Sequence, residues 1–483
     1  MKWRVACPTC GASELRSSHE KSSAARERHT ALDLTASATW SRGEPASTWD
    51  ASGRSVVAIA SIATPPSPPG IFRGWLVVTG VFITLAITSG LGFYNASVIL
   101  EAAKDELGAS VAAVSGATTL FFAVGGISGF LASPLIDRID VRWFYLVGGI
   151  VGAGALAALR WVDSTAELYA FFAVFGVGFS LAGLVPGTTV VARWFNVRRS
   201  VALSIATTGL SVGGIAITPL AARIIDGREL SGAGPWMGLA WLAVIPLAIG
   251  LIRSWPSDVG LQPDGVADPP PGVDPAALVG ATFADARSSR FFRLLSFTYA
   301  MVFLSQVGGL AHLFNLTTER VDKGAAAATL STLAFASVAG RLLGGVVVTR
   351  VPIKTMTSIL IVVQALALAV VAFASTQTML LLSAAIFGLS VGNLLMLQPL
   401  LLAETFGVKE YSRIYSYNQL FGTIGVAGGP FLIGFIHDLA SYRTAMLVAS
   451  AVNLTALVAF VAAGSVTDAR SVWSTPASVR AVD

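Results

Sequence analysis

Residues 359–374 read ILIVVQALALAVVAFA and residues 379–397 read MLLLSAAIFGLSVGNLLML, and neither stretch carries a charge. An α-helix rises about 1.5 Å per residue, so about 20 apolar residues cross the hydrocarbon core of a bilayer. A membrane β-barrel would instead show segments of about ten residues with alternating polarity. Because backbone groups in lipid must be hydrogen-bonded within the element, the two stretches predict membrane-spanning helices.

Segments of this kind occur as two sets of six, joined by a polar, proline-rich stretch. The connections between them repeat as well. The dipeptide DR at 137–138 recurs as TR at 349–350, and FNVR at 195–198 recurs as FGVK at 406–409. A six-helix unit repeated in one orientation is typical of transporters that rock about a site between their halves. The predicted fold is an all-α polytopic membrane protein of twelve transmembrane helices in two six-helix pseudo-repeats, with spans at 74–98, 111–136, 143–161, 165–190, 199–222, 236–254, 291–315, 325–349, 355–374, 378–403, 413–436 and 442–464.

The regions outside the spans have the composition of tails and linkers. The first part is rich in Ser, Ala, Thr and Arg and ends in PPSPP at 65–69, which is typical of disorder. A start codon assigned too far upstream would also explain this tail. Proline and glycine turns mark the stretch between the halves. The predicted organisation is a disordered tail 1–70, a first six-helix half 71–255, a cytoplasmic linker 256–290, a second half 291–465 and a C-terminal tail 466–483.

Hydrophobic residues make up 54% of the 483 residues and charged residues only 12%, which excludes a soluble multidomain protein. The formal charge of +5 does not indicate a nucleic-acid partner, because the basic residues occur singly or in small groups between spans. Basic residues are denser on one side of the implied topology, which the positive-inside rule places in the cytoplasm. This predicts a multi-pass protein of the cell (inner) membrane with both termini cytoplasmic.

The sequence offers little for metal or enzyme chemistry. Cys7 and Cys10 resemble half of a zinc knuckle, but no second Cys or His pair follows at ligand spacing. We find no nucleotide-binding loop and no convincing nucleophile–base pair. We therefore expect no cofactor, no metal site and no enzymatic activity.

Two connections carry a family resemblance. Residues 129–142 read GFLASPLIDRIDVR, which resembles the cytoplasmic signature of the major facilitator superfamily, although Ser133 and Asp140 stand where glycines are usual. Residues 193–202 read RWFNVRRSVA and lead into a glycine-rich stretch at 209–214. This part resembles the fifth-helix signature of the monocarboxylate transporter-like branch, which includes relatives of the oxalate/formate antiporter. The resemblance implies the major facilitator fold and secondary transport.

Arg341, in the motif GRLLG at 340–344, is the main candidate for substrate binding. It lies about nine residues before Arg350, or roughly 13 Å into the membrane, where a guanidinium needs a partner. Its planar set of donors matches a carboxylate. In the oxalate-transporting relatives, an arginine at this position contacts the substrate anion. The alternative is a structural arginine that bonds backbone carbonyls or extends toward the cytoplasm.

Two departures from the relatives bear on the substrate. Oxalate-transporting relatives also carry a lysine in the eleventh helix, near residues 423–425 of this chain, which read TIG. One fixed cation instead of two favours a monovalent anion. The lysine that animal monocarboxylate carriers have in the first helix is also absent, because residues 93–95 read FYN.

His312 is a candidate for carrying a coupling proton, since a histidine has an ordinary pKa of about 6.5. A hydrogen-bonded packing histidine is the alternative. Polar residues of the presumed cavity helices form a weaker set of substrate-binding candidates, namely Tyr94, Asn95, Gln306 and Asn393, with Ser180 and Ser390 as further members. Amides in lipid often bond across helices instead.

The connections at the basic side supply the candidates for a cytoplasmic gate. Charges there can pair with helix ends when the gate is shut and separate when it opens. The gate candidates are Asp137, Arg138, Arg142, Arg350 and Arg413.

The main hypothesis is a secondary transporter that moves a small organic anion, a monocarboxylate, by alternating access. Its expected partners are the anion, with or without a proton, and the lipid bilayer, and we expect a monomer. Two alternatives stay open: an efflux carrier for apolar or cationic compounds, and a sensor that keeps the transporter fold.

Overall fold

The computed structural model describes three stretches of the chain, which are residues 72–108, 111–265 and 279–474. The chain divides into two units, residues 1–64 and residues 65–483, and every described residue lies in the second. The predicted N-terminal tail, with Cys7 and Cys10, therefore lies outside the described residues.

The described residues fold almost entirely into helices, and twelve helical stretches are long and apolar enough to cross a membrane. The predicted twelve-helix, all-α fold is confirmed, and the chain is a multi-pass membrane protein. The six stretches of the first half are α1–η1–α2 (Arg73–Thr88, Ser89–Phe93, Asn95–Leu107), α3 (Val111–Ile136), α4–η2 (Val141–Ala158, Leu159–Trp161), α5–α6 (Thr165–Leu181, Leu184–Trp194), α7–η3–α8 (Arg199–Val212, Gly213–Ile217, Thr218–Asp226) and α9–α10 (Glu229–Leu242, Val244–Leu251).

Single unbroken helices form all six spans of the second half. They are α12 (Arg290–Arg320), α13 (Lys323–Val347), α14 (Ile353–Phe373), α15 (Gln377–Phe406), α16 (Tyr411–Leu439) and α17 (Tyr442–Ala462). Short helices occupy the connections: η4 (Pro256–Val259), η5 (Pro263–Gly265), α11 (Phe283–Ser288) and α18 (Val466–Ser474). Helix α18 lies in the stretch that was predicted to be a C-terminal tail, residues 466–483.

The helices differ from the predicted spans mainly in length. The first predicted span ends at residue 98, but its helical path continues to Leu107. The sixth is predicted from residue 236, but its helix begins at Glu229. Both extensions carry charged residues, which a search for apolar runs passes over. The Glu106 side chain of the first extension accepts a hydrogen bond of 2.9 Å from the Leu230 backbone N–H of the second.

Short polar side chains set where several helices begin. Such a residue accepts a hydrogen bond from one of the first unpaired N–H groups of the helix. Ser164 and Glu167 form a reciprocal capping box at the start of α5. Single caps of the same kind begin α4, α12, α13, α15 and α17, at Asp140, Ser289, Asp322, Thr376 and Ser441.

The same pattern of packing occurs in both halves, which gives the repeat a structural basis. The first span packs against the fifth in each half, as α1 with α7 and as α12 with α16. The second packs against the fourth, as α3 with α5 and as α13 with α15. The third packs against the sixth, as α4 with α9 and as α14 with α17.

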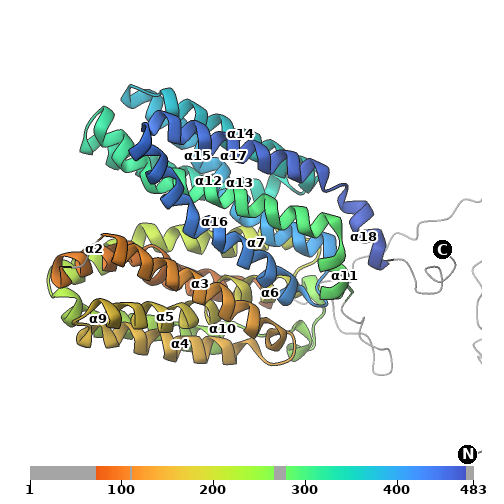
Figure 1. Ribbon diagram of the computed structural model, residues 1–483. Helices are drawn as coiled ribbons and strands as arrows, with labels where there is room; N and C mark the ends of the chain where they lie inside the picture. The colour runs from red at the N-terminus through yellow and green to blue at the C-terminus, as the bar shows by residue number, and fades with distance from the viewer. Residues whose placement is uncertain (1–71, 109–110, 266–278, 475–483) are drawn as a thin grey trace, which may run out of the picture. The chain divides into compact units, whose positions relative to one another are not determined.

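Two helix pairs join the halves, and the repeat relates them to each other. One pair is α3 with α16 and the other is α7 with α13, so that in each pair a second span meets the fifth span of the other half. We call them the α3–α16 seam and the α7–α13 seam. In Figure 1, α4, α5 and α9 of the first half lie on one side of the seams and α14 and α17 of the second half on the other.

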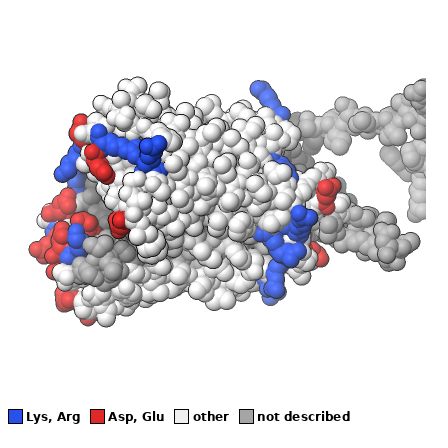
Figure 2. All heavy atoms as spheres, turned by 45° about the horizontal axis from the view of Figure 1, so that its top comes forward, with Lys and Arg blue, Asp and Glu red and all other residues white. Residues whose placement is uncertain are grey.

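Charged side chains gather at the two ends of the bundle on the face that Figure 2 shows, and an uncharged belt lies between them. One end carries mostly Lys and Arg, and the other carries both signs. We call the first the basic end and define it by Arg138, Arg142, Arg350, Lys354 and Lys409. The helices α11 and α18 lie at this end (Figure 1).

The first and fifth spans approach each other closely where both form short π-helical segments. Gly213 begins one of these, and a Cβ atom there would lie 2.9 Å from Gly90 N and against Ala86 O and the Ser89 hydroxyl. The Ser89 hydroxyl donates to Leu210 O over 2.7 Å. Small residues let helix backbones pack in lipid, where no hydrophobic effect drives their association.

We therefore expect the substitution Gly213→Val to destabilise the fold. The valine side chain would force the two π-helical segments apart, and overpacking of this kind typically costs about 1–3 kcal/mol. The thermal unfolding midpoint of the purified protein should fall by several degrees. Gly154→Val is the matched control, because a Cβ atom at Gly154 has nothing within 4 Å. Equal midpoints for the two variants would contradict close packing at Gly213.

Candidate functional site

Arg341 lies on α13 between the two halves. Its side chain is buried, with an exposed fraction of 1% for the residue. Its Nε donates a hydrogen bond of 3.0 Å to Gly392 O on α15, in the same half. Its Nη1 donates to Thr207 O on α7, in the other half, and the Ser204 hydroxyl donates to Arg341 O. One side chain therefore bonds backbone carbonyls of both halves at the α7–α13 seam.

Arg341 differs from the other buried arginines in its partners. Among the described residues, the buried arginines are Arg193, Arg199 and Arg341. Arg193 pairs with Asp137 over 2.7 Å and Arg199 pairs with Glu404 over 3.4 Å. No ion pair among the described residues includes Arg341. Carbonyl oxygens accept from its Nε and Nη1 but leave its charge without a counter-ion, and a buried charge of this kind is costly.

The two polar residues predicted on the first span have different surroundings. Tyr94 follows the π-helical segment η1, is half-buried, and lies close enough to Arg341 for the guanidinium charge to act on its hydroxyl. A Cβ atom at Gly214 would lie 2.8 Å from the Tyr94 ring, so this ring packs on the fifth span. The Asn95 side chain is buried, and its Nδ2 donates to Met237 Sδ over 3.3 Å, within the first half. The structure thus places Tyr94, but not Asn95, near Arg341.

Asn393 lies directly after Gly392, whose carbonyl accepts from Arg341. Its Nδ2 donates to Leu389 O over 2.8 Å, and its Oδ1 has no hydrogen-bond partner among the described residues. Gln306 on α12 is also buried, and its Oε1 has no hydrogen-bond partner among the described residues. Both amides keep an unused acceptor inside the second half.

His312 lies on α12 with contacts to α16 and α17. Its Nε2 is 3.0 Å from Pro430 O, and its ring centre is 5.8 Å from that of Tyr442. Since a carbonyl only accepts, Nε2 must carry the hydrogen in this bond. Nδ1 is buried and has no partner in the described part of the chain. None of these contacts involves Arg341, so the structure does not join the two candidates directly.

Several further polar groups in the second half are buried without a partner among the described residues, and the sequence analysis did not select them. Among them are Tyr299 Oη on α12 and Tyr415 Oη, Ser416 Oγ and Gln419 Oε1 on α16. One face of α16 carries Tyr415, Gln419 and Gly422, at helical spacings of four and three. This spacing is the sequence pattern from which a polar face of α16 could have been predicted. Cavity residues were predicted only on the first, fourth, seventh and tenth spans, and α16 is the eleventh span.

Other amides bond to each other across helices, as the alternative interpretation expects. Gln398 Nε2 donates to Asn418 Oδ1 over 2.6 Å, and Asn418 Nδ2 donates to Ser296 Oγ over 3.0 Å. This network lies within the second half and joins α15, α16 and α12. None of these bonds crosses to the first half.

At the basic end, Asp137 joins the halves. Its Oδ1 accepts from Arg193 Nη2 over 2.7 Å, within the first half. Its Oδ2 accepts from the Ser412 hydroxyl over 2.6 Å, at the start of α16 in the second half. Burial raises the pKa of Asp137 above its ordinary value, although the Arg193 charge and the Ser412 hydrogen bond act in the opposite direction. The carboxyl group is thus strongly desolvated at the α3–α16 seam.

The other gate candidates have less direct roles in this structure. Arg142 bonds Asp140 within the first half, and Asp140 also accepts from the Ser254 hydroxyl over 2.7 Å. Burial acts to raise the pKa of Asp140, but hydrogen bonds, mainly from Arg142, outweigh it and lower that pKa. The side chains of Arg138 and Arg350 are exposed at the basic end.

A second contact between the halves at the basic end was not predicted. Arg199 at the start of α7 pairs with Glu404 near the end of α15. Glu404 also pairs with Arg470 of α18 over 3.3 Å, and Arg470 Nε donates to Glu404 O over 3.0 Å. These residues lie far apart in the sequence, so only the folded arrangement reveals the pairing.

The aromatic residue Phe283 of α11 lies where the halves meet. Its ring centre is 6.1 Å from that of Phe130 on α3 and 5.3 Å from that of Tyr417 on α16. The backbone just before it is tied to the α15–α16 connection, because Ala281 N–H donates to Phe406 O over 2.7 Å. The described end of the linker, around α11, is therefore packed against both halves.

Comparisons with known proteins agree with this architecture. The sequence profile described as Major Facilitator Superfamily matches residues 82–401 and 289–480. Monocarboxylate transporter 13 of Rattus norvegicus is 25% identical over 397 residues, which cover 80% of this chain and 88% of the relative. The oxalate:formate antiporter of Oxalobacter formigenes is 24% identical over 190 residues, which cover 39% of this chain and 44% of that protein.

The solved structure of the E. coli fucose:proton symporter FucP has a TM-score of 0.60 and 15% sequence identity to this chain. The alignment covers 82% of this chain and 99% of the symporter, so the two proteins share a fold. The family profile covers both six-helix halves, whose packing repeats span for span. This chain therefore belongs to the major facilitator superfamily of transporters and is not an enzyme.

Proposed function

We propose that this protein is a secondary transporter for a small organic monocarboxylate and that Arg341 binds the carboxylate. The observation that carries the proposal is a guanidinium buried between the halves with carbonyl partners and no carboxylate among the described residues. An anionic substrate would supply the missing counter-ion. The names of relatives in the family, monocarboxylate transporter 13 and oxalate:formate antiporter, support an organic anion as the substrate class.

A monocarboxylate fits the charge of this region better than a dicarboxylate. Arg193 and Arg199, the two other buried arginines of the described residues, already have acidic partners. On α16, residues 423–425 read TIG, and the Thr423 hydroxyl donates to Gln419 O over 3.0 Å. One uncompensated cation balances one carboxylate.

The proposed mechanism is alternating access with the basic end facing the cytoplasm, as the positive-inside rule favours. The described polar and aromatic contacts between the halves run from the middle of the bundle to the basic end. On the α3–α16 seam, Gly126 packs against Thr423, and the Ser412 hydroxyl bonds Asp137 at the basic end. In the proposed mechanism, this arrangement is a state in which the basic end is closed. Transport requires these contacts to separate.

We expect Arg341→Ala to abolish saturable carboxylate binding and uptake. Losing the fork of charged donors removes the counter-ion for the substrate, and we expect at least about a hundredfold loss of affinity. A panel of mono- and dicarboxylates should raise the melting temperature of the parent protein by mass action, and monocarboxylates should do so most. Uptake of the best ligand into proteoliposomes should then be lost in the variant.

Arg341→Lys separates binding from folding, because it keeps the charge but loses the planar fork. It should fold as the parent does and show intermediate affinity. Lys323→Ala, which removes an exposed cation at the start of the same helix, is the control and should transport normally. Unchanged uptake in Arg341→Ala would refute the site. Stabilisation by apolar cations but by no acid would instead favour an efflux carrier.

We also propose that His312 carries the proton in a proton-coupled cycle. Its Nε2 is engaged with Pro430 O, so the unpartnered Nδ1 is the atom that can accept a proton. His312→Gln should leave carboxylate binding intact and remove the stimulation of uptake by an inward proton gradient. The measurement is uptake with and without a pH difference across proteoliposomes. A gradient response equal to that of the parent would show that the proton travels elsewhere.

We expect the Ser412 hydrogen bond to Asp137 to hold the basic end closed. Ser412→Ala removes this contact between the halves but leaves the Asp137–Arg193 pair in place. A hydrogen bond to a charged group contributes about 1.5–3 kcal/mol, so the open population should rise at least about tenfold. Spin labels on cysteines introduced at Ile139 and Lys409, with Cys7 and Cys10 replaced by serine, should report the change as a longer distance.

Ser288→Ala is the control for this experiment, since the Ser288 hydroxyl bonds only within its own short helix, to Asp285 O. Its distance distribution should match the parent. An unchanged distribution in Ser412→Ala would mean that the other contacts between the halves close the basic end without this bond.

A further inference from the structure

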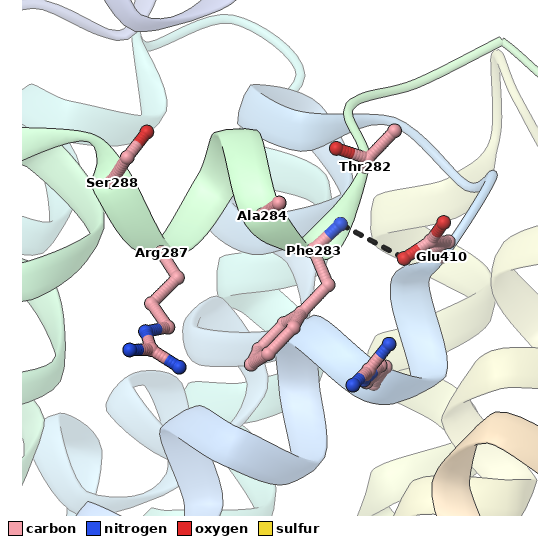
Figure 3. A pocket seen from close by; sticks show the side chains of 7 residues that line it. Thr282, Phe283, Ala284, Arg287, Ser288 and Glu410 are labelled. Atoms are coloured by element: carbon pink, nitrogen blue, oxygen red, sulfur yellow. Dashed lines mark hydrogen bonds between the residues drawn. The ribbon is translucent and has the colours of Figure 1, made fainter. Parts of the chain in front are cut away.

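A cavity of about 620 Å³ lies at the basic end, apart from Arg341. It is formed between α11 and the start of α16, and its lining residues are Thr282, Phe283, Ala284, Arg287, Ser288, Glu410 and Arg413. Figure 3 shows the Arg287 and Phe283 side chains extending to the same side of α11. The carbon at the centre of the Arg413 guanidinium is 4.5 Å from the centre of the Phe283 ring. Two guanidinium groups and an aromatic ring thus line one cavity.

The charges of the cavity favour an anion. Arg413 stacks on Phe283, and its Nε is buried with no hydrogen-bond partner among the described residues. Arg287 is exposed, and no ion pair of the described residues includes it. Glu410 is the one acidic residue of the lining, and its Oε2 accepts from Phe283 N–H over 2.9 Å, as Figure 3 shows.

The hydroxyl groups of the lining are already used. The Thr282 hydroxyl donates to Asp285 Oδ2 over 2.7 Å, and the Ser288 hydroxyl donates to Asp285 O over 2.8 Å. The free donors are therefore those of the two arginines. The lining residues carry two guanidinium charges and one carboxylate, and the Asp285 carboxylate lies behind the Thr282 hydroxyl. A phosphodiester group between the two arginines would neutralise the single positive charge of the lining.

The position of the cavity suggests where such a group would come from. The cavity lies beside Tyr411, where α16 begins, and on the helix that leads into α12. Membrane-spanning helices start at these points, so a bilayer around the spans would have its lipid headgroups nearby. Basic pockets between membrane helices on the cytoplasmic side bind anionic headgroups. Guanidinium groups match phosphate oxygens in geometry as well as charge.

We propose that this cavity is a binding site for a phosphodiester group, held by Arg287 and Arg413 and supplied by a phospholipid headgroup. A bound phosphate would join α11, which follows the linker, to the first turn of α16, which begins the α3–α16 seam. The site does not depend on the identity of the transported substrate, because Arg341 has no part in it.

The test is a titration of the purified full-length protein with four soluble probes, read as the rise in melting temperature. The probes are dioctanoyl phosphatidylglycerol, its deacylated form glycerophosphoglycerol, inorganic phosphate, and dioctanoylglycerol, which has no phosphate. We expect saturable stabilisation by the first probe, a weaker effect from the second and none from the last. Stabilisation by inorganic phosphate alone would assign the same site to free phosphate and overturn the lipid source.

Three variants locate the site. Arg287→Gln should raise the half-saturating concentration about tenfold, and it removes an exposed side chain that folding does not need. Glu410→Gln keeps an acceptor for Phe283 N–H but removes the negative charge, so it should tighten binding. Arg290→Gln is the matched control, since Arg290 is exposed nearby but does not line the cavity. Equal effects of Arg287→Gln and Arg290→Gln, or no saturable response to any phosphate probe, would refute the proposal.

Discussion

The structure depends on one buried charge, the guanidinium of Arg341. A charge at this depth needs compensation, and here backbone carbonyls from both halves provide it. Thr207 and Gly392 belong to different halves, so the bonds of Arg341 to both carbonyls also fix how the two halves meet. A carboxylate that displaced one of these carbonyls would change the contact between the halves as it bound. A ligand shifts a conformational equilibrium only through such differential contacts.

The seams between the halves must be stable in each state and yet separable. Glycine and small hydroxyl residues meet this requirement, because they allow close approach without interlocking side chains. Gly345 packs against Ser204 on one seam, and Gly126 lies against Thr423 on the other. Few large side chains would have to change rotamer when such surfaces part. The stronger contacts are the charged ones, which are concentrated at the basic end and in Arg341.

Much of the fold follows from the sequence, because lipid imposes simple rules. Long uncharged runs must be helices, and the recurrence of FNVR at 195–198 as FGVK at 406–409 identifies the repeat. The charged extensions of the first and sixth spans and the helix α18 were missed, since hydropathy alone does not register amphipathic helices at membrane surfaces.

The candidate site was only partly predictable. The depth of Arg341 follows from counting residues along one helix, so its burial could be expected. Its partner Thr207 lies 134 residues away in the sequence, and no local pattern connects them. The same holds for Asp137 and Ser412, which are 275 residues apart. Local periodicity gives the face of a helix, whereas partners across the seams depend on how the two halves dock.

The repeat relates the two seams to each other, but their polar contacts differ. Its symmetry relates the connection with Asp137 to the one with Thr349, and the two seams to each other. Asp137 bonds across its seam at the basic end, whereas the Thr349 hydroxyl bonds only Val346 O in its own helix turn. On that second seam the polar contact lies deeper, at Arg341. One seam thus carries a charged contact at its end and the other carries one in its middle. Under the proposed function, a substrate at Arg341 would act on the second seam, while the Asp137 contact would hold the first.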